Sequence, residues 1–158
     1  MFTFDPESDA LKPMSRRKVT ITAPAQMLRG ARRKLVVEAQ PLPSLGELKI
    51  PANKGIEKLL VLVIDDRVRD AETRDEVYEF EKPLTYVIEY TKEDIAATTL
   101  NADGTPRLSI VTGYQTQDGW KFERLPTKVT PNPKTGGGTL TAQVKTLQPL
   151  DPKWISIP

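Results

Sequence analysis

The 158-residue chain contains neither cysteine nor histidine. Without cysteine it can form no disulfide, thiolate zinc site, iron–sulfur cluster or thiol nucleophile. Without histidine it lacks the usual general base near neutral pH, which excludes a Ser-His-Asp triad and the usual zinc centres. Carboxylate pairs, lysine and hard metals bound through oxygen remain open to it. These absences favour a protein that is not an enzyme, and no cofactor is expected.

Long apolar runs and long helical windows are also lacking. The longest apolar run, residues 59–64, is far too short to span a bilayer. The first residues show no basic segment followed by an apolar one, so no signal peptide is visible. For an unprocessed chain this predicts a cytoplasmic location. The 14 prolines are spread over the sequence and interrupt every long helical window.

The pattern that is present is β alternation punctuated by turns. The clearest strand is 84–91, where Leu84, Tyr86, Ile88 and Tyr90 fall on one face. Further strands are expected at 17–23, 34–39, 58–64, 77–80, 107–115, 120–125, 127–130, 139–147 and 153–157, the last at a sheet edge. The sequence therefore predicts an all-β fold, an antiparallel β-sandwich of about eight to ten short strands. This single domain covers residues 17–158 and follows an irregular arm over residues 1–16.

Three local signals refine this expectation. Pro83 should break or shift its strand at an edge or bulge, because proline cannot donate to the ladder. Thr91 and Asp94 predict a capping box for one helical turn over 92–98. Residues 117–119, Gln-Asp-Gly, predict a type I′-like hairpin turn between the strands on either side.

Three stretches occur in a recognisable order. They are Phe80-Glu-Lys-Pro-Leu-Thr-Tyr-Val-Ile-Glu-Tyr90, then Gly119-Trp120 with Leu125-Pro-Thr-Lys-Val129, and then Gly138-Thr-Leu-Thr-Ala-Gln-Val144. Their order and spacing resemble the β-sandwich domain shared by ankyrins, netrin receptors, zonula occludens proteins and many bacterial surface and scaffold proteins. The resemblance covers residues 58–150; residues 1–57 do not match clearly. It implies a rigid, non-catalytic module that presents loops or edges to other proteins.

Some members of that family cleave their own backbone at a His-Phe-Ser tripeptide just after the last of these strands. The aligned positions here are Thr146, Leu147 and Gln148. Both the attacking serine and the activating histidine are missing, so the resemblance implies that this chain does not cleave itself.

The net charge of +2 is distributed unevenly. Basic residues dominate the first 34 positions, and seven of them form a candidate partner-binding group: Arg16, Arg17, Lys18, Arg29, Arg32, Arg33 and Lys34. No aromatic side chain is interleaved for base stacking, so nucleic acid is not expected, and a protein partner or plain surface is favoured. The basic region of one copy could also meet the acidic stretch of another, giving self-assembly.

Acidic residues dominate residues 65–81. Five of them are candidate calcium ligands, because calcium prefers several oxygen ligands from one flexible loop: Asp65, Asp66, Asp70, Asp75 and Glu76. The stretch lacks the ligand spacing and glycine of an EF-hand, and three arginines within it can neutralise the acids. The alternative is a solvated loop between strands.

Three aromatic residues, Tyr114, Trp120 and Phe122, surround one predicted hairpin. A flat row of these rings would bind sugar by stacking, whereas the alternative is packing in the core or at its rim. The sequence as a whole predicts a structural or protein-interaction subunit of a larger assembly. Its partners would be other proteins or copies of itself, bound through strand edges, complementary charge patches and the tails 1–16 and 149–158. A carbohydrate-binding module is the alternative.

Overall fold

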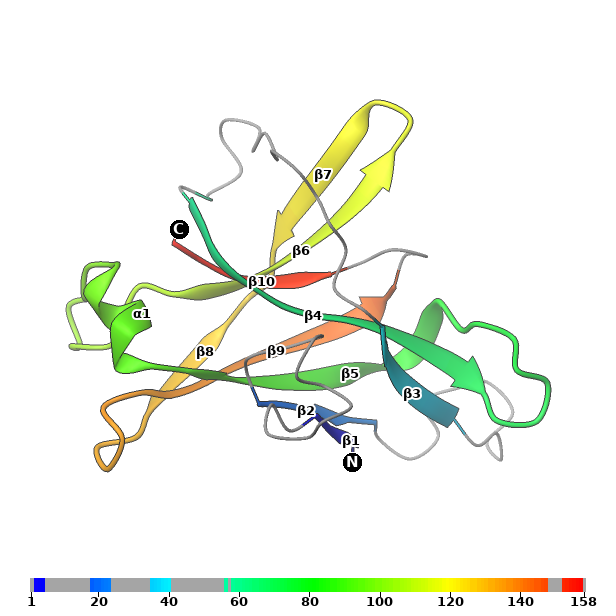
Figure 1. Ribbon diagram of the computed structural model, residues 1–158, viewed down its shortest axis with the longest axis horizontal. Helices are drawn as coiled ribbons and strands as arrows, with labels where there is room; N and C mark the ends of the chain where they lie inside the picture. The colour runs from blue at the N-terminus through cyan, green and yellow to red at the C-terminus, as the bar shows by residue number, and fades with distance from the viewer. Residues whose placement is uncertain are drawn as a thin grey trace.

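The structure is a computed structural model that describes residues 2–4, 18–23, 35–40, 56, 58–147 and 152–157. Two five-stranded antiparallel sheets pack face to face (Figure 1). The first has the order β1-β2-β5-β9-β8, with β1 at Phe2–Phe4, β2 at Val19–Thr22, β5 at Glu79–Tyr90, β9 at Gly138–Thr146 and β8 at Lys128–Pro131. The second has the order β3-β4-β10-β6-β7, with β3 at Leu35–Gln40, β4 at Lys58–Asp70, β10 at Lys153–Ile157, β6 at Ser109–Thr116 and β7 at Gly119–Arg124. The predicted antiparallel all-β sandwich is confirmed.

The main core lies between the two sheets. Leu84, Tyr86 and Ile88 of β5 are fully buried, as their period-two spacing predicts. They belong to the same apolar cluster as Ile110 of β6 and Ile155 of β10 on the opposite sheet. Each such side chain contributes about 1.5–3 kcal/mol when it leaves water, so this alternation supplies much of the drive to fold.

The strand predicted at 58–64 is longer than expected. β4 continues to Asp70, because β3 pairs with its second half in a register that runs from Leu35↔Asp70 to Gln40↔Asp65. Val68 within this half is buried against Val37 across the pair. The acidic stretch therefore begins inside a strand, and the expectation of a loop at 65–70 is wrong.

The effect of Pro83 is confirmed as a bulge. The pairing of β5 with β9 shifts register between Glu79 and Leu84, the interval that contains Pro83. The shift does not end the strand, so the segments predicted at 77–80 and 84–91 form largely one strand, β5. β5 lies inside its sheet between β2 and β9, not at an edge.

The strand predicted at 153–157 has the expected bounds, but the prediction that it lies at a sheet edge is wrong. β10 lies in the middle of its sheet between β4 and β6, and Lys153, Trp154, Ile155 and Ser156 are all buried. Residues 153–157 are thus built into their own sheet and do not form a tail available to a partner. At the other end, β1 forms within the predicted arm and pairs with β2. The rest of residues 1–16 lies outside the described residues.

The helical turn is confirmed as α1, Lys92–Ala96, and the Thr91 N–H donates to Asp94 Oδ2 at 2.9 Å. At five residues α1 cannot cross a membrane, and it is the only helix in the part of the chain that the structure describes. The β6–β7 turn is not type I′, which needs positive φ at both central residues. The left-handed residue is instead Gly119, with φ of 108°.

Candidate functional site

A cluster of polar side chains lies inside the sandwich, where sequence analysis expected only apolar packing. Asp66 on β4, Tyr86 on β5 and Lys153 on β10 have exposed fractions of 2%, 0% and 0%. The Tyr86 hydroxyl donates to Asp66 Oδ2 at 2.6 Å, and Lys153 Nζ lies 5.5 Å from the centroid of the Tyr86 ring. Charged side chains are almost never buried to this degree unless they are paired, and Tyr86 contacts both Asp66 and Lys153.

Sequence analysis missed this cluster because it assigned Asp66 to a calcium-binding or solvated loop and residues 153–157 to an edge strand. Lys153 lies on the same face of β10 as Ile155, two residues further along, and this face turns toward the core. A lysine at a core-facing position of a short apolar strand was the available signal.

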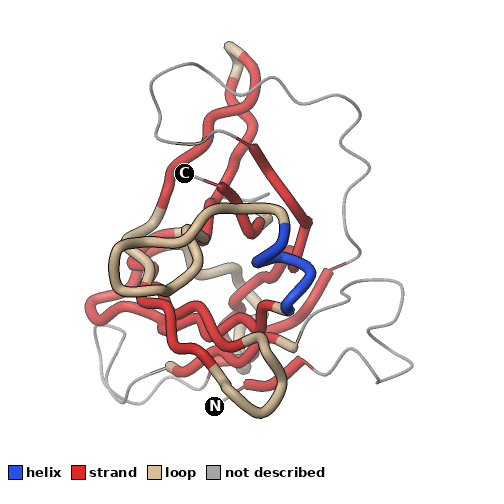
Figure 2. Tube along the Cα trace, turned by 90° about the vertical axis from the view of Figure 1, so that its left-hand side faces the viewer, coloured by secondary structure: helices blue, strands red, loops and turns tan. Residues whose placement is uncertain are grey.

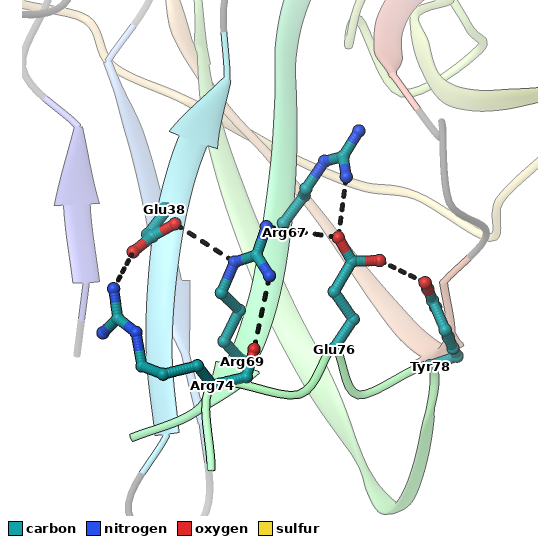
Figure 3. Close-up of polar contacts among 6 residues, drawn as sticks. All are labelled: Glu38, Arg67, Arg69, Arg74, Glu76 and Tyr78. Atoms are coloured by element: carbon teal, nitrogen blue, oxygen red, sulfur yellow. Dashed lines mark hydrogen bonds and ion pairs between the residues drawn. The ribbon is translucent and has the colours of Figure 1, made fainter. Parts of the chain in front are cut away.

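A second polar network covers the outside of β3 and β4 (Figure 3). Glu76 Oε1 lies 2.7 Å from Arg67 Nη1 and 3.3 Å from Arg69 Nη2. Glu38 on β3 lies 3.4 Å from Arg69 Nε and 3.7 Å from Arg74 Nη2. The network thus connects β3, β4 and the segment that follows β4, and it stabilises this corner of the sandwich.

Tyr78 completes the network by donating its hydroxyl to Glu76 Oε2. This hydrogen bond, with a further one from Arg67, lowers the pKa of Glu76 below its ordinary value. The same bond to Glu76 raises the pKa of Tyr78. Glu76 is therefore held as a carboxylate that accepts from both sides, which is a structural role.

The five candidate calcium ligands are not brought together. Asp65 and Asp66 are buried, whereas Asp75 is exposed. Asp70 Oδ1 accepts from the N–H groups of Glu72 at 2.9 Å and Thr73 at 3.1 Å, which closes the turn after β4. Glu76 binds arginines, as described above. In the described ranges no three acidic side chains are grouped to hold a metal ion.

Of the basic partner-binding group only Lys18 lies among the described residues. Lys18 is exposed just before β2, and its carbonyl accepts from the Glu89 N–H at 3.1 Å. The other members, Arg16, Arg17, Arg29, Arg32, Arg33 and Lys34, lie outside the described residues.

The three aromatic residues of the β6–β7 hairpin do not form one row. Trp120 stacks on Phe122 with their ring centroids 6.2 Å apart, and both rings contact Trp154 on the outer face of the sheet. Phe122 is only 4% exposed there. Tyr114 pairs with Lys121, whose side chain alternates with those of Trp120 and Phe122, so the Tyr114 ring lies on the opposite face.

The β6–β7 hairpin projects beyond the body of the sandwich (Figures 1 and 2). Its inner face and β9 enclose a groove of about 340 Å³, lined in part by Thr112, Tyr114, Glu123, Gln143 and Lys145. The groove is lined by charged side chains of both signs and by one aromatic ring.

Among the described strands, the outer edge of β7 has no neighbour. β7 is the last described strand of its sheet. The Leu125 N–H donates back to the Ile110 carbonyl at 2.9 Å, which marks that pair as hydrogen-bonded. Because hydrogen-bonded and open pairs alternate in an antiparallel ladder, the backbone groups of Trp120, Phe122 and Arg124 point away from β6.

No protein-family model, curated protein or solved structure matches this chain. The resemblance to the ankyrin, netrin-receptor and zonula-occludens domain therefore stays a prediction.

Proposed function

We propose that this protein is a non-catalytic interaction subunit of a larger assembly, and that its partner adds a strand to the open edge of β7. The observation that carries the proposal is the row of outward-facing backbone groups at Trp120, Phe122 and Arg124 on a projecting hairpin. Unpaired N–H and C=O groups on an edge strand are a template for pairing with another chain.

The neighbouring edge is less suited to this role. β8 has four residues and ends at Pro131, which has no N–H to donate. Proline at a strand edge blunts pairing with another chain. β7 has six residues and contains no proline, so a partner can follow it along its length.

Side chains on the two faces of β7 would select the partner. Trp120 on the outer face is half-buried and offers a ring surface, whereas Glu123 lines the groove on the other face, which Lys121 shares. In strand addition the backbone supplies affinity, and the alternating side chains supply specificity. A carbohydrate-binding role gains no support from this geometry, because Tyr114 lies on the opposite face from Trp120 and Phe122.

The test compares two substitutions at one exposed residue. Arg124→Pro removes an N–H that faces the open edge and places a ring there, whereas Arg124→Ala removes the side chain and leaves the N–H in place. The protein is purified from its own cells under gentle conditions, and its assemblies are measured by native mass spectrometry. We expect a stable assembly with the wild type and with Arg124→Ala, and its loss with Arg124→Pro.

Two results would overturn the proposal. One is a wild-type protein that is monomeric and co-purifies with no partner, and the other is an assembly that persists in the Arg124→Pro variant. Circular dichroism of both variants establishes that the fold is intact before binding is compared.

A further inference from the structure

The buried cluster of Asp66, Tyr86 and Lys153 places an amine and a carboxyl group together in the interior. Lys153 pairs with Ile64 on the neighbouring strand β4, and Asp66 lies two residues further along β4. Diagonal neighbours of this kind lie about 7–8 Å apart, a distance that the side chain of lysine spans. Tyr86 connects the two groups, since its ring lies beside Lys153 Nζ and its hydroxyl binds Asp66.

We propose that Lys153 and Asp66 condense to form an intramolecular amide between Nζ and Cγ, which cross-links β10 to β4. This modification is independent of the partner-binding role proposed above. Asp66 supplies the acyl group, Lys153 supplies the nitrogen, and the Tyr86 hydroxyl assists the reaction.

The chemistry balances without an oxidant or a further reactant. The Lys153 ammonium passes one proton to the Asp66 carboxylate, and the resulting amine attacks Cγ. The Nζ–Cγ bond forms and one Cγ–O bond breaks. The departing oxygen leaves as water with two of the three ammonium protons, and the amide nitrogen keeps the third. The Tyr86 hydroxyl donates to Oδ2, where negative charge develops during the attack.

Burial provides the driving force that these groups lack in water. A buried ion pair carries a desolvation cost, and condensation replaces two charges with one neutral amide. Packing that holds reacting groups in position corresponds to effective concentrations of about 10⁵–10⁸ M in favourable cases. The site has almost no exposed surface, so once the released water has escaped, bulk water does not reach the amide and it is protected from hydrolysis.

The intact mass of the purified, denatured wild-type protein tests the proposal. We expect a mass lower than the sequence mass by one water molecule. Proteolysis should release a branched peptide that joins the fragment containing Asp66 to the fragment containing Lys153. A wild-type protein at its full sequence mass would overturn the proposal, as would a cross-link from Lys153 to any residue other than Asp66.

Four variants identify the bond. Lys153→Arg and Asp66→Ala should restore the full sequence mass, whereas Lys121→Arg, at an exposed lysine on β7, should still lose one water. Asp66→Asn should give the same final mass as the cross-linked wild type, because the asparagine loses ammonia where the aspartate loses water.

A succinimide at an Asp-Gly pair would also lose one water. Asp103-Gly104 and Asp118-Gly119 are such pairs. Incubation at mildly alkaline pH hydrolyses a succinimide and restores the mass, but leaves an amide between side chains unchanged. Recovery of the full mass under these conditions would overturn the proposal.

Discussion

Two tyrosines of this protein make the same hydrogen bond in opposite environments. Tyr86 donates to Asp66 in the interior, and Tyr78, which is 40% exposed, donates to Glu76 at the surface. At the surface, water replaces a lost partner, whereas in the interior the carboxyl group is left without that donor. Burial, and not bond geometry, therefore decides what each hydroxyl contributes.

Tyr86→Phe should lower the free energy of unfolding by about 1–3 kcal/mol, because the buried Asp66 loses a donor. Tyr78→Phe removes the matching bond at the surface and should change the stability by no more than about 0.5 kcal/mol. Chemical denaturation of both variants and the wild type measures the difference. Equal losses in the two variants would contradict this account.

Gly113 is a second residue whose identity is fixed by its surroundings. A Cβ at this position would lie 2.7 Å from the Trp154 ring and 3.0 Å from the Phe122 ring. Gly113→Ala should therefore destabilise the protein by about 1–3 kcal/mol through overpacking. Gln115→Ala, at an exposed position two residues further along β6, is the control and should stay within about 0.5 kcal/mol of the wild type.

At the scale of elements, the corner formed by β3, β4 and the segment after β4 is held by charge. Glu76 accepts hydrogen bonds from Tyr78 and Arg67 and forms an ion pair with Arg69, and these partners lower its pKa. A carboxylate whose pKa is lower in the folded state stabilises the fold above its unfolded pKa, and this contribution is lost as the pH falls through the folded pKa. The corner should loosen in acid before the apolar core does.

Glu76→Gln measures this contribution. The stability difference between wild type and variant should be greatest near neutral pH and should shrink as the pH falls below the ordinary glutamate value of 4.5. Its size should not exceed about 1 kcal/mol, because the arginine partners are partly solvated. Added salt should reduce it further. A difference that stays constant from pH 7 to acid would show that the ion pairs contribute nothing.

Truncations distinguish a central strand from an edge strand. Removal of residues 153–158 takes β10 from between β4 and β6, so cooperative thermal unfolding should be lost. Removal of residues 1–4 takes away only β1, which pairs with β2 alone, and should lower Tm while leaving unfolding cooperative. Circular dichroism during heating compares the two. A cooperative transition without residues 153–158 would contradict the strand order.

At the scale of the whole molecule, strand order sets which backbone groups are protected. β5, β9 and β10 each have a strand on both sides, whereas β7 has one neighbour among the described strands. Amide hydrogen exchange should be slowest in the first three and fastest at the tip of the β6–β7 hairpin. Exchange in β10 as fast as in β7 would contradict the arrangement.

The sequence allowed prediction of what depends on neighbours along the chain. Period-two spacing located the core face of β5, and Thr91 with Asp94 located the start of α1. The central place of β10 and the length of β4 could not be read this way, because both depend on pairing between segments far apart in the sequence. The buried lysine at 153 was missed for a related reason: the two residues that it lies beside, Asp66 and Tyr86, come from two other strands.

The position of β10 has a consequence for synthesis on the ribosome. Chains emerge at about 5–20 residues per second, so β4 and β6 are made well before the strand that lies between them. Until β10 arrives, each of the two presents backbone N–H and C=O groups that lack the partner strand. The nascent chain is therefore most prone to aggregate during the interval between the completion of β6 and the release of β10, when a chaperone that shields exposed strands would be of greatest benefit.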